Sequence, residues 1–306
     1  MSAKLVPSCG GILWGYAGPD TSPGGLAAVE STMPSPFDFV YRFHDLDDTI
    51  PQPDEVSLVD EGRLLHVSID SVIYSSDGHR LIRWHDVAAG AYDESLSAQA
   101  HGLAALDTPV FVTFEHEMDQ GRKAALGTSA DFRAAWRHVH SLFIEAGASN
   151  VVWVWVAMGW PETFATAGQM WPGNDVVDWI SWDAYNTSGC RTGAIDATKS
   201  KSFADVVLPF LQWLKTNAAR YGIDASKPMM ISETGTVVHP ERPSLATEWY
   251  QEMPAVLAAH PQIRAVTLWA SVGVGTCDYR FTHVPEVSSS IAAVRESTKL
   301  RTGIRQ

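Results

Sequence analysis

Eight short apolar runs, each followed by polar or glycine residues, recur along the chain, and helical stretches fall between them. We predict strands over residues 12–16, 37–43, 64–69, 110–114, 151–156, 177–182, 229–232 and 265–269. The clearest helices are predicted over residues 95–106, 130–146, 203–221, 245–259 and 289–297, with Ser129 as the cap of the second. Near-continuous apolar strands that alternate with helices indicate a parallel sheet covered by helices.

Eight strand and helix units favour closure of this sheet into a barrel. A length of 306 residues suits an α/β barrel, whose typical size is about 250 residues plus insertions. No Rossmann-type glycine fingerprint, linker or internal repeat divides the sequence. We therefore predict a single (β/α)8 TIM barrel over residues 1–306, with extended loops at the C-terminal face of the strands. Residues 159–173 and 186–199 are two such loops.

The net charge of the chain excludes some classes of binding partner. With 22 basic and 35 acidic residues, the chain has a net charge of −13, which repels nucleic acid and anionic lipid surfaces. No uncharged apolar run is long enough to span a bilayer. A neutral polysaccharide or oligosaccharide is compatible with this charge. No heptad pattern marks a partner interface, so we expect a monomer.

Three cysteines bear on location and on metal binding. Cys190 and Cys277 each lie just beyond a predicted strand end, where two neighbouring loops could be bridged, and we expect a disulfide between them. Cys9 is then unpaired; the alternative is three isolated thiols. Residues 1–7 lack the apolar core of a signal peptide, yet the cysteine usage favours an extracellular native protein. No spacing resembles a zinc site, and we expect no metal or cofactor.

Two predicted strands end on glutamates that are far apart in the sequence. Glu117 ends the segment FVTFEHE, and Glu233 ends the segment MMISE. A retaining glycosidase holds two carboxyl groups about 5–5.5 Å apart, one as the acid and one as the nucleophile. Such a pair must sit at neighbouring ends of one rigid sheet. Glu117 and Glu233 are therefore the candidate catalytic residues.

The residues before Glu117 have two interpretations each. Alternation along a strand puts Glu115 on the same face as Glu117 and His116 on the other. Glu115 would then help to keep Glu117 protonated, because two nearby carboxylates resist joint ionisation. Alternatively, Glu115 pairs with a buried base such as Arg42. His116 either orients the substrate or a catalytic carboxylate, or is a structural imidazole.

Further candidates follow the later strands. Asp183 and Tyr185 share a face of the sixth strand, and the Tyr185 phenol could donate a hydrogen bond that keeps Glu233 ionised. Asp183 either contacts the substrate or caps the next loop. A flat indole suits the apolar face of a sugar ring, so we assign Trp269, Trp160 and Trp171 to the substrate as well.

Several motifs occur together in a fixed order. They are His116-Glu117-Met118, FRAAWRHVH at 132–140, AGASNVVWVW at 146–155, WPGNDVVDW at 171–179, DAYN at 183–186 and SETG at 232–235. In these motifs the sequence resembles glycoside hydrolase family 26, a group of retaining β-glycanases on the eightfold barrel whose best-known members are β-mannanases. The resemblance spans residues 109–271 and is looser before them, through WHDVAAG at 84–90.

The resemblance implies roles for individual residues. Glu117 would be the acid/base and Glu233 the nucleophile, with His116 and Tyr185 in support and Trp269 as the sugar platform. One departure is that family mannanases follow His-Glu-Met with Asn-Gly and a tryptophan-rich stretch, whereas this chain has DQGRKAA at 119–125.

The sequence thus predicts a retaining, endo-acting hydrolase of a β-linked polysaccharide, with β-1,4-mannan as the first choice. A β-1,3-1,4-glucanase and a β-xylanase are alternatives within the family. A carbohydrate-binding barrel without turnover is an alternative of another class. A third class is a metal-dependent hydrolase that uses Glu115, His116 and Asp119.

Overall fold

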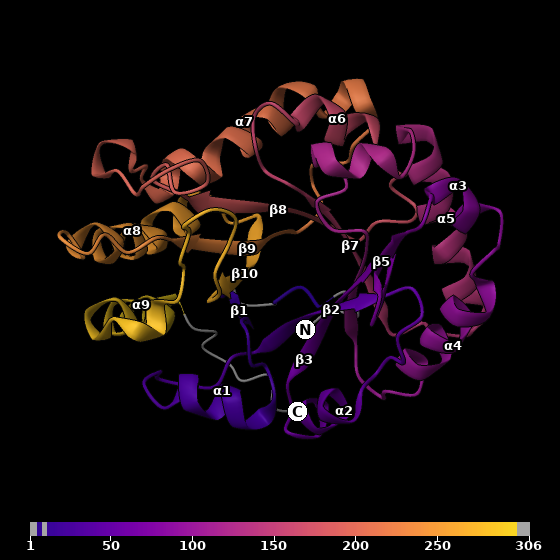
Figure 1. Cartoon of the computed structure of the whole chain (residues 1–306), viewed down its shortest axis with the longest axis horizontal. Coiled ribbons are helices and arrows are strands. Elements are labelled where there is room, and N and C mark those ends of the chain that lie inside the picture. The colour runs from indigo at the N-terminus through magenta and orange to yellow at the C-terminus, as the bar shows by residue number, and fades with distance from the viewer. Residues whose placement is uncertain (1–4, 8–10, 299–306) are drawn as a thin grey trace.

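The eight predicted strands close into one parallel barrel in the computed structural model, which describes residues 5–7 and 11–298. Around the barrel the strands follow the order β1-β10-β9-β8-β7-β6-β3-β2 (Figure 1). They are β1 (Leu13–Ala17), β2 (Phe39–Asp45), β3 (Leu64–Asp70), β6 (Val110–Phe114), β7 (Val151–Ala157), β8 (Trp179–Asn186), β9 (Met229–Thr236) and β10 (Ile263–Trp269). Each predicted strand overlaps one of these, so the predicted fold class is confirmed.

Helices lie around the outside of the barrel (Figure 1). They are α1 (Pro23–Glu30), α2 (Pro53–Asp60), α3 (Trp84–Ala88), α4 (Asp93–Ala104), α5 (Ser129–Glu145), α6 (Phe164–Gln169), α7 (Phe203–Tyr221), α8 (Ser244–Ala259) and α9 (Pro285–Thr298). The five predicted helices are α4, α5, α7, α8 and α9. Helices α1, α2, α3 and α6 were not predicted, and each has eight residues or fewer. Within the described residues, no helix combines the length and apolarity needed to cross a membrane.

The start of α5 corrects the predicted cap. Thr128, not Ser129, is the N-cap: its side chain accepts a hydrogen bond from the Asp131 amide. The Asp131 carboxylate in turn accepts from the Thr128 amide at 2.8 Å. This reciprocal capping box satisfies two amides that the helix itself leaves unpaired.

Large side chains fill the barrel interior away from the C-terminal ends of the strands. Phe111 packs edge-on against Phe39 and Trp179, with ring centroids 5.9 and 5.3 Å apart. All three residues are fully buried. In the described part of the chain this layer fills the interior, so we expect a ligand site at the face where the strands end, as is general for barrels of this type.

A short antiparallel hairpin, β4 (Val72–Ser75) and β5 (Gly78–Leu81), follows β3 and was not predicted. Most of its residues are exposed, so it lacks the apolar alternation that indicates a strand. The amide of Tyr74 donates to the Asp45 carboxylate at 2.8 Å, which holds the hairpin beside the end of β2.

The predicted disulfide between Cys190 and Cys277 is present. It joins the segment after β8 to the segment after β10, across the strand β9 that lies between them. Both sulfurs are buried against Val237 and Tyr279. Cys9 lies outside the described residues.

Replacement of both Cys190 and Cys277 by alanine is expected to lower the free energy of unfolding by about 2–4 kcal/mol, because the bridge restricts the unfolded chain. The two residues are 87 positions apart. Denaturant unfolding with and without reductant measures this effect. The variant should be insensitive to reductant, and the reduced parent should match it. Equal stability of the oxidised and reduced parent would contradict the expectation.

Candidate active site

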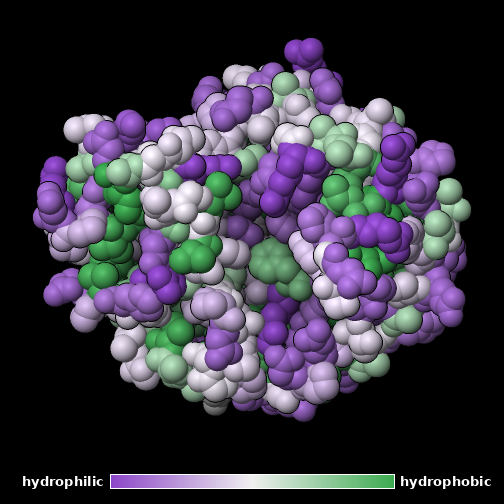
Figure 2. All heavy atoms as spheres, in the orientation of Figure 1, coloured by the Kyte–Doolittle hydropathy of each residue, from purple (hydrophilic) through white to green (hydrophobic). Residues whose placement is uncertain are grey.

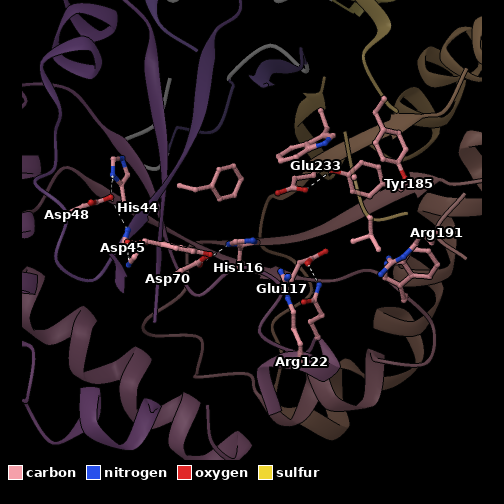
Figure 3. A pocket seen from close by; sticks show the side chains of 18 residues that line it. His44, Asp45, Asp48, Asp70, His116, Glu117, Arg122, Tyr185, Arg191 and Glu233 are labelled. Atoms are coloured by element: carbon pink, nitrogen blue, oxygen red, sulfur yellow. Dashed lines mark hydrogen bonds and ion pairs between the residues drawn. The ribbon is translucent and has the colours of Figure 1, made fainter. Parts of the chain in front are cut away.

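A cavity of about 590 Å³ opens at the C-terminal ends of the barrel strands. Figure 2 shows the hollow near the centre of this face, with hydrophilic residues around it. Its lining includes six of the residues that the sequence analysis selected: His116, Glu117, Trp160, Tyr185, Glu233 and Trp269. Figure 3 shows both glutamates pointing into this one space.

The backbone turns sharply after β6 and so directs Glu117 into the cavity. Glu115 and Glu117 adopt left-handed conformations, with φ of 62° and 47°. Such angles are unfavourable for residues other than glycine and recur at functional sites. The Glu117 amide donates to the Val156 carbonyl at 3.1 Å, and the Gln120 amide group donates to Glu117 Oε2 at 2.6 Å. These two bonds fix both the backbone and the carboxylate of Glu117.

The same turn sends Glu115 elsewhere, so the prediction that it shares a face with Glu117 is wrong. Glu115 is buried, and its Oε1 lies 2.7 Å from Lys123 Nζ. Its Oε2 accepts hydrogen bonds from the Ser71 amide at 2.9 Å and the Trp84 indole at 3.1 Å. The alternative of a buried base is therefore right in kind, although the base is Lys123. Arg42 instead pairs with Asp54.

Glu233 lies on β9 beside Asp183 of β8 and is 7% exposed. The Tyr185 hydroxyl donates to Glu233 Oε2 at 2.6 Å, as predicted. Burial raises the pKa of Glu233 from an ordinary value of 4.5 to about 7. The nearby Glu117 adds to this rise, whereas the charge of His116 and the Tyr185 hydrogen bond oppose it. Burial therefore disfavours the ionised form of Glu233, whereas Tyr185 and His116 favour it.

His116 belongs to a charge network that sequence reasoning did not find. Its Nδ1 lies 2.9 Å from Asp70 Oδ1 and 3.1 Å from Ser68 Oγ. Burial disfavours the imidazolium, but the Asp70 carboxylate outweighs that cost and raises the pKa of His116. Lys123 donates to the His116 carbonyl and lies 3.9 Å from Asp70. The one sequence signal for Asp70 is that it ends strand β3, as Glu117 follows β6.

Asp183 does not line the cavity, and neither role predicted for it matches its position. It is 2% exposed, and its Oδ1 accepts a hydrogen bond from Ser232 Oγ at 2.8 Å. Burial and the neighbouring Glu233 raise the pKa of Asp183 well above its ordinary value. Asp183 thus lies buried between β8 and β9, and the protonated form of its carboxyl group is favoured.

The three tryptophans assigned to the substrate divide into two groups. Trp269 and Trp160 line the cavity as predicted. Trp171 does not: it is 5% exposed, and its ring packs edge-on against Trp155 at 5.2 Å. Trp171 is a core residue because the loop after β7 folds back over the barrel wall. Phe43 was missed; it lines the cavity, with its ring centroid 6.0 Å from that of Trp269.

The metal-dependent alternative lacks a ligand set. Glu115 contacts Lys123, His116 contacts Asp70, and Asp119 accepts a hydrogen bond from the Met158 amide at 2.8 Å. Among the residues that the structure describes, no three His, Cys, Asp or Glu side chains form a group that could hold a metal ion.

Comparison with known sequences gives partial matches. No family model matches the chain. A β-1,3-xylanase from Vibrio sp is 28% identical over 173 residues, which cover 56% of this chain and 32% of that protein. A β-1,3-xylanase from Alcaligenes sp is 26% identical over 173 residues, 56% of this chain and 31% of that protein. The matched region thus spans about a third of the length of these relatives.

Solved structures share the fold over nearly the whole chain. A family 26 β-mannanase from Bacteroides ovatus has a TM-score of 0.65 at 16% identity, covering 95% of this chain and 89% of that one. A modular endo-β-1,4-mannanase from Cellulomonas fimi has a TM-score of 0.62 at 17% identity, covering 93% and 71%. The structural similarity confirms the barrel fold that the resemblance to glycoside hydrolase family 26 implied.

The raised pKa of Glu233 predicts a pH-dependent loss of stability. The folded protein binds this proton more tightly than the unfolded chain, so the stabilisation is complete below pH 4.5 and is lost as the pH rises through about 7. Glu233→Gln does not titrate and should gain on the order of 3 kcal/mol over the parent between pH 4 and pH 8. Urea unfolding across this range measures the gain.

Glu248→Gln, on the exposed side of α8, is the matched control. It should follow the parent at every pH. If Glu233→Gln also follows the parent, burial does not perturb Glu233 in the way described.

Proposed function

We propose that this chain is a retaining, endo-acting glycoside hydrolase that cleaves a β-linked polysaccharide. The observation that carries the proposal is the entry of Glu117 and Glu233 into one cavity from separate barrel strands. The names of the similar proteins, β-1,3-xylanases in sequence and β-mannanases in structure, support the same reaction class.

In the first step, a Glu233 oxygen attacks the anomeric carbon while Glu117 protonates the departing glycosidic oxygen. Tyr185 holds Glu233 Oε2, which leaves the second oxygen as the attacking atom. The bond to the leaving sugar breaks, and a glycosyl ester forms on Glu233. Ionised Glu233 is required, so the positive charge of His116 assists the step by favouring that form.

In the second step, Glu117 acts as a base. Having given up its proton, it removes one from a water molecule, which attacks the anomeric carbon and releases Glu233. Gln120 donates to Glu117 Oε2 and leaves Oε1 for proton exchange. Two displacements at the same carbon restore the original β configuration. Trp269, at the cavity wall, offers an apolar surface to the sugar ring.

Two polysaccharides are favoured by separate observations. The order of the motifs and the structural neighbours favour β-1,4-mannan, as expected from the sequence. The two sequence relatives favour β-1,3-xylan. Since these relatives are more similar in sequence than the mannanases, we place β-1,3-xylan first as the substrate and β-1,4-mannan second.

A hydrolysis screen tests this order. Linear β-1,3-xylan, β-1,4-xylan, β-1,4-mannan and mixed-linkage β-1,3-1,4-glucan are incubated with the protein, and released reducing sugar is measured. We expect the largest release from β-1,3-xylan and a mixture of oligosaccharide lengths, as endo action requires. A larger release from mannan would reverse the order. Binding of a glycan without any product would favour the carbohydrate-binding alternative.

Glu233→Ala and Glu117→Ala separate the two roles. Removal of the nucleophile Glu233 should reduce the turnover rate by about 10⁴-fold or more. The reason is that Glu117 and Glu233 act together in one reaction, so that removing one also disables the other. Circular dichroism should show that both variants remain folded. Glu248→Ala, remote from the cavity, should keep the parent rate.

The stereochemistry of the first product provides the second readout. Proton NMR during early turnover should detect the β anomer before mutarotation. An α anomer as first product would contradict double displacement, and an active Glu233→Ala protein would remove the nucleophile assignment.

A further inference from the structure

Two arginines, Arg122 and Arg191, line the cavity, and neither makes an ion pair with a carboxylate in the described part of the chain. Four of the eleven other described arginines have acidic partners: Arg42 with Asp54, Arg63 with Glu30, Arg137 with Asp175 and Arg280 with Asp278. In a chain of net charge −13, what distinguishes these two guanidinium groups is their position in the lining of the candidate active site.

Arg191 is held in place from two sides. Its guanidinium lies 4.7 Å from the centroid of the Trp160 ring, a cation–π contact that restrains its direction. Its backbone follows the bridged Cys190, whose carbonyl accepts a hydrogen bond from the Thr276 amide at 3.0 Å. Gly275 packs so closely that a Cβ there would lie 2.8 Å from the Arg191 carbonyl. The guanidinium is therefore oriented before a ligand arrives.

Arg122 stands on an equally fixed backbone. It belongs to the short 3-10 helix Gly121–Ala125 that follows the acid/base residue. The next residue, Lys123, is buried, and its Nζ lies 2.7 Å from Glu115. The Arg122 side chain is exposed and faces the cavity. Because the backbone is held in this way, only the long Arg122 side chain is free to move, and it can turn toward a bound group.

Besides the two arginines, five acidic residues line the cavity: Asp45, Asp48, Asp70, Glu117 and Glu233. In Figure 3, Arg122 and Arg191 lie on the side of Glu117, whereas Asp45 and Asp48 lie at the opposite end beyond His116. Asp45 and Asp48 line the same cavity. A negatively charged ligand group would be repelled at that end and attracted at the arginine end.

We propose that Arg122 and Arg191 bind an acidic substituent of the glycan, either the carboxylate of a uronic acid or a sulfate ester. Guanidinium groups bind such oxyanions through paired, charge-assisted hydrogen bonds. A wholly neutral glycan would use these groups only as donors to hydroxyls. The inference rests on the proposed function, since it names the substrate class of that same site: a β-glycan that carries acidic groups.

Binding of small glycosides tests the inference without any hydrolysis. The probes are methyl β-D-glucuronide and methyl β-D-glucoside 6-sulfate, each compared with neutral methyl β-D-glucoside. The full chain is titrated with each and followed by NMR. We expect at least one acidic probe to bind about tenfold more tightly than the neutral one. Whichever probe gains identifies carboxylate or sulfate as the group recognised, and its advantage should shrink at high salt.

Variants locate the effect. Arg122→Gln and Arg191→Gln should each remove most of the difference in affinity between the acidic and the neutral probe. Arg220→Gln is the matched control, because Arg220 lies on α7 beside Tyr221 and does not line the cavity. Equal binding of acidic and neutral probes by the parent, or no binding at all, would overturn the inference. Hydrolysis in the polysaccharide screen is measured separately, so the proposed function can stand or fall independently of this result.

Discussion

Closure of the parallel barrel is the constraint on which the rest of the site depends. In the described part of the chain, Phe39, Phe111 and Trp179 fill the barrel interior, and the cavity opens where the strands finish. Residues that follow β6 and residues of β9 then meet across one cavity, although they are far apart in the chain. Strand β9 itself positions Glu233, whereas Glu117 lies in the turn after β6, which is attached to β7 by the hydrogen bond from the Glu117 amide to the Val156 carbonyl.

Several features around Glu117 and Glu233 are unfavourable for the stability of the folded protein. Left-handed conformations at Glu115 and Glu117 cost free energy, and so do the partly buried charges of Asp70 and His116 and the buried charge of Lys123. Each of these charges has an opposite partner within the network, which reduces the cost. In the resulting cavity, the pKa values of Glu233 and His116 are both raised. The charge of each of these two residues affects the pKa of the other.

The repeated strand and helix pattern was predicted from the sequence, whereas features that depend on tertiary packing were not. Apolar runs and long helices identified all eight barrel strands and the five longer helices, whereas the β4–β5 hairpin has too few buried residues to register. Glu117, Glu233 and Tyr185 were found because they end or follow strands. Glu115 was misplaced because strand alternation was extended beyond Phe114, where the backbone turns.

Loop residues were the least predictable. Trp160 and Trp171 come from the same loop, and only burial against Trp155 separates the core residue from the cavity residue. Gln120 and Asp70 contact catalytic or supporting side chains, yet no motif distinguishes them from ordinary surface residues.

The central claim is that Glu233 forms a covalent bond with the sugar. The most direct measurement is mass spectrometry of the protein after incubation with a 2-deoxy-2-fluoro β-glycoside of xylose or mannose that carries a good leaving group. The account predicts an added mass of one fluorosugar on the peptide that contains Glu233, absent from Glu233→Ala. Labelling of a different carboxylate, or turnover of the cleavable glycan by the parent with no trapped adduct from either sugar, would contradict it.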